Sequence, residues 1–112
     1  MLMTLLQEME AERLRERERL RLGVRDQLHA VLGEFIPGLK AVVFGSLVRP
    51  GRFTEHSDVD LALEAEPPAM SRFQLTSLLS ERLGRRVDLI LLSECRFRDK
   101  ILREGETWTT PD

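Results

Sequence analysis

The sequence predicts an α/β (α+β) fold built as a single domain, and three observations support this prediction. Short runs of β-branched and aliphatic residues, bounded by Gly and Pro, alternate with longer segments that carry apolar residues at helical spacing. A chain of 112 residues has room for only one hydrophobic core. Its one cysteine, Cys95, excludes an intramolecular disulfide and a zinc site with several cysteines.

We divide this single domain into three parts. A charged N-terminal helical region covers residues 1–36, a core covers residues 37–105, and a polar tail covers residues 106–112. Within the first part, residues 2–35 are expected to form one long helix, because apolar residues recur along it at helical spacing. The pair Pro37-Gly38 ends the helix.

The middle of this long helix, residues 10–21, is almost wholly charged. Glu and Arg stand three residues apart there, so their side chains are neighbours on a helix. The predicted pairs are Glu10–Arg13, Glu12–Arg15, Glu16–Arg19 and Glu18–Arg21. Two interpretations stay open: a solvated helix held by its own ion pairs, and a helix that projects toward a partner.

Three short strands are expected in the core, at residues 40–44, 59–63 and 86–92. Residues 45–57 form a loop that has room for a helical turn. A helix begins at Ser71, where Gln74 three residues on completes a capping-box pattern, and Gly84 fits its C-terminal end. A final short helix is expected over residues 93–105. Its inward-facing residues would be Phe97, Ile101 and Leu102.

Charge and hydropathy exclude several classes of protein. The net charge is only −2, whereas a protein that coats nucleic acid is usually strongly basic, so we do not expect nucleic acid as a direct partner. No apolar run approaches the roughly 18–20 residues that span a bilayer. The N-terminus is charged within its first turns and has no long apolar segment before a small-residue cleavage site, so we do not expect a signal peptide. We therefore expect a cytoplasmic protein without a membrane partner.

Two carboxylates at the start of the second strand are candidate metal ligands. Asp58 and Asp60 stand two residues apart, so on a strand both side chains point to the same side of the sheet. Such close carboxylates repel each other unless a cation lies between them. Mg²⁺ prefers oxygen ligands and takes substrate phosphates as further ligands. The alternative is an exposed pair of aspartates at the mouth of a strand.

A third carboxylate and a Gly-Ser pair add to this pattern. Asp88 lies within an apolar strand, where a charge is costly unless it is paired or bound to a metal. Gly45 and Ser46 directly follow the first strand. A glycine there permits a tight turn and close approach of the backbone to a ligand, and free amides beyond it can hold a phosphate. An edge strand and an ordinary turn are the alternatives.

Taken together, these motifs resemble the nucleotidyltransferase (DNA polymerase beta-like) superfamily. The resemblance rests on the stretch FGSLVRPGRFTEHSDVDL, residues 44–61, and on Val87-Asp88-Leu89-Ile90. It extends over about residues 40–105. Within the superfamily the chain is similar to the minimal nucleotidyltransferase (MNT) antitoxins of HEPN–MNT toxin–antitoxin pairs. One departure is Pro50, which lengthens the loop between Ser46 and Asp58 by one residue relative to the usual pattern.

The resemblance implies a short mixed β-sheet with helices packed on one side. It also implies a reaction, the transfer of AMP from ATP to a hydroxyl of a partner HEPN-type RNase toxin. In HEPN–MNT pairs this hydroxyl belongs to a tyrosine, and the transfer silences the toxin. Asp58, Asp60 and Asp88 would be the catalytic residues and would hold Mg²⁺. Gly45, Ser46 and Arg49 would bind the nucleotide.

Two other functions stay open at this point. The chain could be a non-catalytic antitoxin subunit that neutralises the toxin by binding alone, or a nucleotidyltransferase for a small molecule. Against the small molecule, the chain has no room for the additional substrate domain of larger nucleotidyltransferases. Against the non-catalytic subunit, all three aspartates are present.

Overall fold

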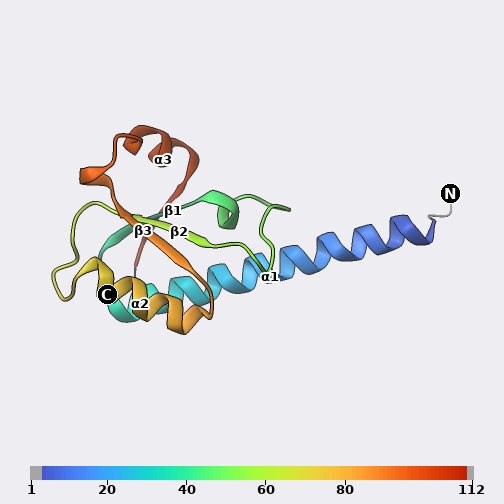
Figure 1. Cartoon of the computed structure of the whole chain (residues 1–112), viewed down its shortest axis with the longest axis horizontal. Helices are drawn as coiled ribbons and strands as arrows, with labels where there is room; N and C mark the ends of the chain where they lie inside the picture. Colours follow the sequence, from blue (N-terminus) through green and yellow to red (C-terminus); the bar gives the residue numbers. More distant parts are fainter. Residues whose placement is uncertain (1–3, 111–112) are drawn as a thin grey trace.

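The computed structural model describes residues 4–110, which form three α-helices, two short 3₁₀ helices and four strands (Figure 1). In chain order these are α1 (Leu5–Phe35), β1 (Lys40–Phe44), η1 (Gly45–Val48), β2 (Val59–Leu63), α2 (Arg72–Leu83), β3 (Val87–Leu91), η2 (Leu92–Glu94), α3 (Arg98–Glu104) and β4 (Glu106–Thr109). The expected start of the first helix, at residue 2, lies outside the described residues. No helix of the described part has the length and apolar character that crossing a membrane requires.

The four strands form one mixed sheet in the order β3-β2-β1-β4. β1 runs antiparallel to both β2 and β4, whereas β2 and β3 are parallel. The mixed sheet that the resemblance implied is therefore confirmed. The three strands expected from sequence are present with nearly the predicted bounds.

The fourth strand is a correction, because we expected residues 106–109 to belong to a polar tail. They pair with β1, with Trp108 opposite Ala41. Thr110 then fixes the end of the strand, since its buried hydroxyl donates to the carbonyl of Ile36 at 2.6 Å. The alternation of the strand hides only every second residue, which left too little apolar signal for a prediction.

The helices cover both faces of the sheet. α1 and α2 pack on one face, where the main core includes Leu28, Leu32 and Leu79, all fully buried. α3 lies on the other face, above the sheet in Figure 1, and its Ile101 packs with Ala62 of β2. The expectation of helices on one side therefore holds for α1 and α2 but not for the short α3.

The helix α1 extends well beyond the sheet (Figure 1). Its 31 residues span about 46 Å at 1.5 Å per residue. Among the described residues before Arg21 none is buried, whereas the second half contributes four apolar side chains to the core. All four predicted ion pairs form, with N–O distances of 3.3 Å for Glu10–Arg13 and 2.7 Å for Glu12–Arg15. The outer half is thus a helix held by its own charges.

The remaining helices follow their predicted signals in part. Ser71 and Gln74 form the predicted capping box of α2, and Gly84 ends it in the left-handed region with φ +66°. The final helix is shorter than expected, because a 3₁₀ helix and a turn occupy most of residues 92–97. Ile101 is buried as predicted, but Phe97 and Leu102 are exposed, so their expected inward orientation was wrong.

Candidate functional site

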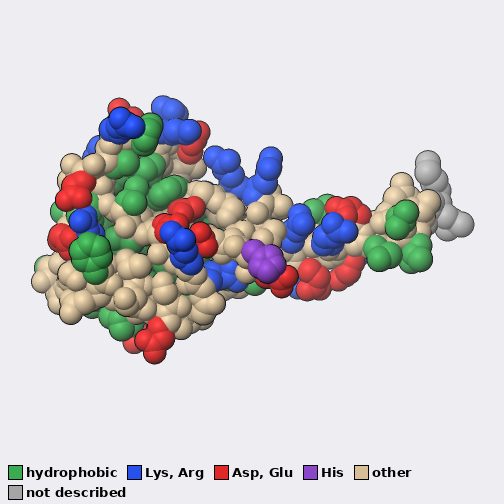
Figure 2. All heavy atoms as spheres, in the orientation of Figure 1, with side chains coloured by type: hydrophobic (Ala, Val, Ile, Leu, Met, Phe, Trp, Pro, Cys, Tyr) green, Lys and Arg blue, Asp and Glu red, His purple; other side chains and the backbone are tan. Residues whose placement is uncertain are grey.

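The three aspartates lie on the two parallel strands at the centre and edge of the sheet. Asp60 on β2 stands directly opposite Asp88 on β3, and Asp58 immediately precedes β2. Each of them is half-buried, with 42% of the Asp58 side chain and 41% of the Asp88 side chain exposed. Figure 2 shows acidic side chains with a basic one among them on the globular part of the molecule. The fold thus brings the three carboxylates to one side of the sheet, as the spacing predicted for Asp58 and Asp60.

Gly45 lies against Asp60 because β1 and β2 are antiparallel neighbours. Phe44 is the register partner of Asp60, so Gly45 follows directly beside that carboxylate. Gly45 has φ +75°, and a Cβ atom built there would lie 2.2 Å from Asp60 Oδ2. A side chain would therefore collide with the carboxylate, and the backbone conformation also favours glycine. The glycine lets η1 begin beside the acidic cluster.

The carboxylates of the cluster influence one another. Burial, followed by the negative charges of Asp88 and Asp58, raises the pKa of Asp60 above its ordinary value. The site thus concentrates negative charge around a partly desolvated carboxylate. A bound cation would relieve both the repulsion and the cost of burial.

Arg86 supplies the positive charge that the cluster has in this structure. Its Nε lies 3.1 Å from Asp88 Oδ1 and 3.9 Å from Asp58 Oδ2. Arg86 and Asp88 stand two residues apart at the start of β3, so they point to the same side. The guanidinium is 73% exposed, which leaves it free to exchange for another cation. The contact with Asp58 forms only when β2 and β3 pair, so the sequence alone does not indicate it.

The predicted nucleotide-binding residues occupy η1 and the loop after it. The amide of Arg49 donates to the carbonyl of Ser46 at 3.1 Å and closes the turn. Arg49 is exposed and lies 3.8 Å from Glu104 of α3. A pocket of about 520 Å³ opens beside them, between η1, β2, β3 and α3. Gly45, Arg49, Asp60 and Asp88 line it together with Lys100 and other residues, whereas Ser46 and Asp58 lie outside its lining.

Two arginines that the sequence does not mark as site residues position these loops. Arg21 of α1 is buried and donates through Nη1 to the carbonyl of Leu47 at 3.0 Å, which ties η1 to the long helix. Arg85 donates to the carbonyl of Ser57 at 2.9 Å and lies over the Phe53 ring, 4.7 Å from its centroid. Arg85 thereby holds the segment that leads into the aspartates. A buried arginine inside a charged run has no signature in sequence that separates it from its neighbours.

The donor set of the cluster fits a hard divalent cation. Three carboxylates converge on one side of the sheet, and the only cationic group within 4 Å of them in the described part of the chain is a displaceable arginine. Within residues 4–110, however, no three His, Cys, Asp or Glu side chains are grouped closely enough to hold a metal ion together. The carboxylates would therefore have to turn toward a cation as it binds.

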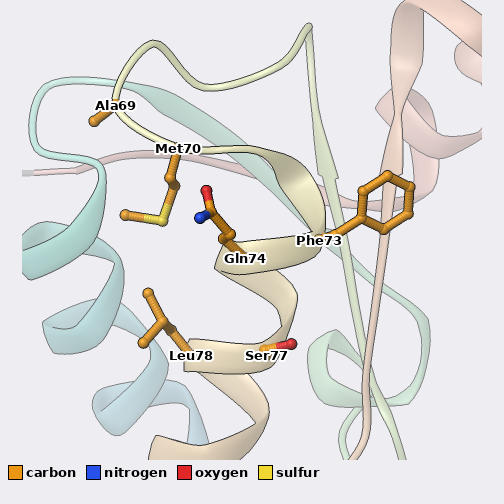
Figure 3. Close-up of a pocket in the computed structure, with 6 residues that line it drawn as sticks. All are labelled: Ala69, Met70, Phe73, Gln74, Ser77 and Leu78. Carbon is orange, nitrogen blue, oxygen red and sulfur yellow. The ribbon is translucent and has the colours of Figure 1, made fainter.

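A second pocket of about 580 Å³ lies on α2 and the loop before it. In Figure 3, Met70, Gln74 and Leu78 point to the side of α2 that faces α1, and Phe73 points away from them. The residues that line this pocket carry no ionisable side chain. It lacks the charged groups that phosphate chemistry requires. The candidate site is therefore the pocket lined by Gly45, Asp60 and Asp88, which we call the acidic pocket.

Comparison with known proteins agrees with this geometry. One solved structure, described as "Crystal structure of the toxin-antitoxin with AMP-PNP", matches with 25% sequence identity and a TM-score of 0.59, covering 76% of this chain and 73% of that chain. A search of curated proteins finds no match. The family model "Polymerase beta, Nucleotidyltransferase" matches residues 28–111, most of the chain, which include the Gly-Ser turn and all three aspartates. The chain therefore belongs to the polymerase beta nucleotidyltransferase family.

Proposed function

We propose that this protein is an Mg²⁺-dependent antitoxin that transfers AMP from ATP to a tyrosine hydroxyl of a HEPN-type RNase toxin. The observation that carries the proposal is the juxtaposition of Asp60, Asp88 and Gly45 at one open pocket. Family membership supports nucleotidyl transfer in general. The similar structure is a toxin–antitoxin with AMP-PNP, which supports a toxin as partner and a nucleoside triphosphate as ligand.

In this proposal Asp58, Asp60 and Asp88 hold the metal. The bound Mg²⁺ supplies positive charge that neutralises the triphosphate and aligns its α-phosphate for attack. The acceptor hydroxyl oxygen forms a bond to the α-phosphorus as the bond to the β-phosphate oxygen breaks, and pyrophosphate leaves. The hydroxyl proton passes to the carboxylate of Asp88, which sits half-exposed at the rim.

The residues of η1 hold the other phosphates. Gly45 allows the backbone to approach the β- and γ-phosphates without a side chain in the way. Ser46 contributes a hydroxyl, and the exposed guanidinium of Arg49 contributes charge at the mouth of the pocket. The exposure of Arg49 suits a reaction with a macromolecular acceptor that approaches from solvent. We place this reaction in the cytoplasm.

Thermal unfolding with and without ATP and Mg²⁺ tests the metal assignment. A ligand at about 100 times its dissociation constant stabilises the folded state by about 2.7 kcal/mol. We expect this stabilisation for the wild type and its loss in Asp58→Asn/Asp60→Asn. The control is Asp26→Asn/Glu81→Gln, which removes the same charge from exposed positions on α1 and α2. Equal stabilisation of both double variants would contradict the assignment.

A second candidate is neutralisation of the toxin by binding alone. One observation favours it: among the described residues no three metal-binding side chains are preassembled, and Arg86 already contacts two of the three aspartates. In that case the triple variant Asp58→Asn/Asp60→Asn/Asp88→Asn would still neutralise the toxin and leave its mass unchanged. Loss of neutralisation in a folded triple variant supports the enzyme.

A further inference from the structure

The outer part of α1, residues 5–22, is an arm that precedes the region matched by the family model, and within it only Arg21 is buried. The family model begins only at residue 28. Three large apolar side chains at the tip of the arm are exposed: Leu5 by 70%, Leu6 by 77% and Met9 by 56%. Figure 2 shows this apolar tip at the end of the projecting helix, separated from the globular part by a charged zone. Such an exposed apolar cluster on a projecting helix is typical of a site that binds another protein chain.

The charges of the arm are segregated along its length. Residues 4–12 contain three Glu and no basic residue, and residues 13–21 contain five Arg and two Glu. The outer half is therefore acidic and the inner half basic. A second arm that runs in the opposite direction would place acidic against basic along the whole contact, whereas a parallel arm would place like charges together. The helix dipoles also favour the antiparallel arrangement.

One face of the arm has the spacing of a two-helix contact. Leu6, Met9, Arg13, Glu16 and Leu20 follow one another at alternating intervals of three and four residues, as the inner positions of a coiled coil do. The two apolar ends of this stripe flank one Arg and one Glu. In an antiparallel pair with Arg13 opposite Glu16, Met9 of one chain lies opposite Leu20 of the other.

The inner end of the arm offers a place for the tip of a second copy. A groove of about 550 Å³ lies where the arm meets the loop before β2. It is lined by residues of both segments, namely Arg13, Glu16, Arg17, Leu20, Thr54, Glu55 and His56. The same stripe that would pair with a second arm therefore runs into this groove.

We propose that two copies of this chain associate through antiparallel arms, with Arg13 of each opposite Glu16 of the other. In this register Met9 at the tip of each copy lies beside Leu20 in the groove of its partner, and Leu6 follows one turn further along, opposite Gly23. The interface is isologous, so every contact occurs twice. It does not depend on the proposed function, because it uses neither the aspartates nor the pocket.

Sedimentation equilibrium of the full chain tests this proposal. We expect a dimer that weakens as salt rises, and a loss of association of about tenfold or more in Leu6→Glu. The matched control is Leu14→Glu, the same substitution at an exposed position on another face of the arm. Far-UV circular dichroism establishes that both variants keep their helix. A monomer at all concentrations, or equal effects of both substitutions, would overturn the proposal.

A charge-reversal experiment tests the register. Arg13→Glu and Glu16→Arg each place two like-charged pairs in their own homodimer, so each variant alone should associate about tenfold or more weakly. An equimolar mixture restores two opposite-charge pairs and should recover the dimer. Failure of the mixture to recover association would refute this register. If the wild type is monomeric and Leu6→Glu instead reduces co-purification of the toxin, the arm binds the toxin and the second-copy proposal is wrong.

Discussion

Replacing Gly45 by alanine should destabilise the protein by two separable effects. The residue has φ +75°, a conformation that costs an L-amino acid about 1–2 kcal/mol. The new Cβ would also lie 2.2 Å from Asp60 Oδ2, so the carboxylate must move. Overpacking of this kind costs about 1–3 kcal/mol. We therefore expect the free energy of unfolding to fall by about 2–5 kcal/mol, within the total of about 5–15 kcal/mol of a typical domain.

Urea denaturation followed by far-UV circular dichroism measures this loss, provided that the slope of the transition is unchanged. Gly51→Ala is the matched control, because Gly51 has φ +80° and no atom within 4 Å of a built Cβ. It should show only the backbone cost of about 1–2 kcal/mol.

A double-mutant cycle with Asp60→Ala isolates the collision. The Cβ of Asp60 lies at an ordinary 3.4 Å from the built Cβ of residue 45, so removing the carboxylate removes the clash. Gly45→Ala should then cost about 1–3 kcal/mol less in the Asp60→Ala background than in the wild type. If Gly45→Ala and Gly51→Ala cost the same, and the cycle shows no coupling, the close approach of η1 to Asp60 is wrong.

Three further predictions concern single side chains. Burial and the neighbouring carboxylates raise the pKa of Asp60, so the folded state binds a proton on Asp60 more tightly than the unfolded state does. The free energy of unfolding therefore falls as pH rises from the unfolded-state pKa of Asp60 through its folded-state pKa. Asp60→Asn should therefore be more stable than the wild type at neutral pH and lose this advantage in acid, and urea titrations that show the reverse order would contradict the shift. Arg86→Gln should tighten Mn²⁺ binding, measured by electron paramagnetic resonance, because it removes the guanidinium that contacts Asp58 and Asp88. The control Arg82→Gln on α2 should leave Mn²⁺ binding unchanged. Weaker binding in Arg86→Gln would show that the guanidinium does not compete with the cation. Arg21→Met should lower the free energy of unfolding by about 1–3 kcal/mol, because it leaves the carbonyl of Leu47 without its partner, and an unchanged urea midpoint would refute that role.

The sequence was sufficient for those features that depend on local signals. The strands around Val43 and Leu61 have a β-branched or alternating pattern, and the capping box at Ser71 specifies a helix start directly. The spacing of Asp58 and Asp60 alone placed them on one side of the sheet. The four predicted ion pairs of α1 also follow from spacing, since each joins residues three apart on the helix.

Features that depend on contacts between distant residues escaped prediction. The strand β4 forms because Trp108 pairs with Ala41 of β1, 67 positions earlier, and its own alternation is too short to predict a strand. Arg21 differs from Arg19 only in what it meets after folding, namely the carbonyl of Leu47. Phe97 was expected inside on apolar character, yet it lies exposed at the rim of the acidic pocket.

The most direct test of the proposed function is the intact mass of a partner HEPN-type toxin after co-expression with this protein. We predict that the toxin gains mass in units of AMP beside the wild type. We also predict that it gains none beside a folded Asp58→Asn/Asp60→Asn/Asp88→Asn variant. A toxin that is neutralised without added mass by the wild type, or that gains the same mass beside the triple variant, would contradict catalysis by the three aspartates.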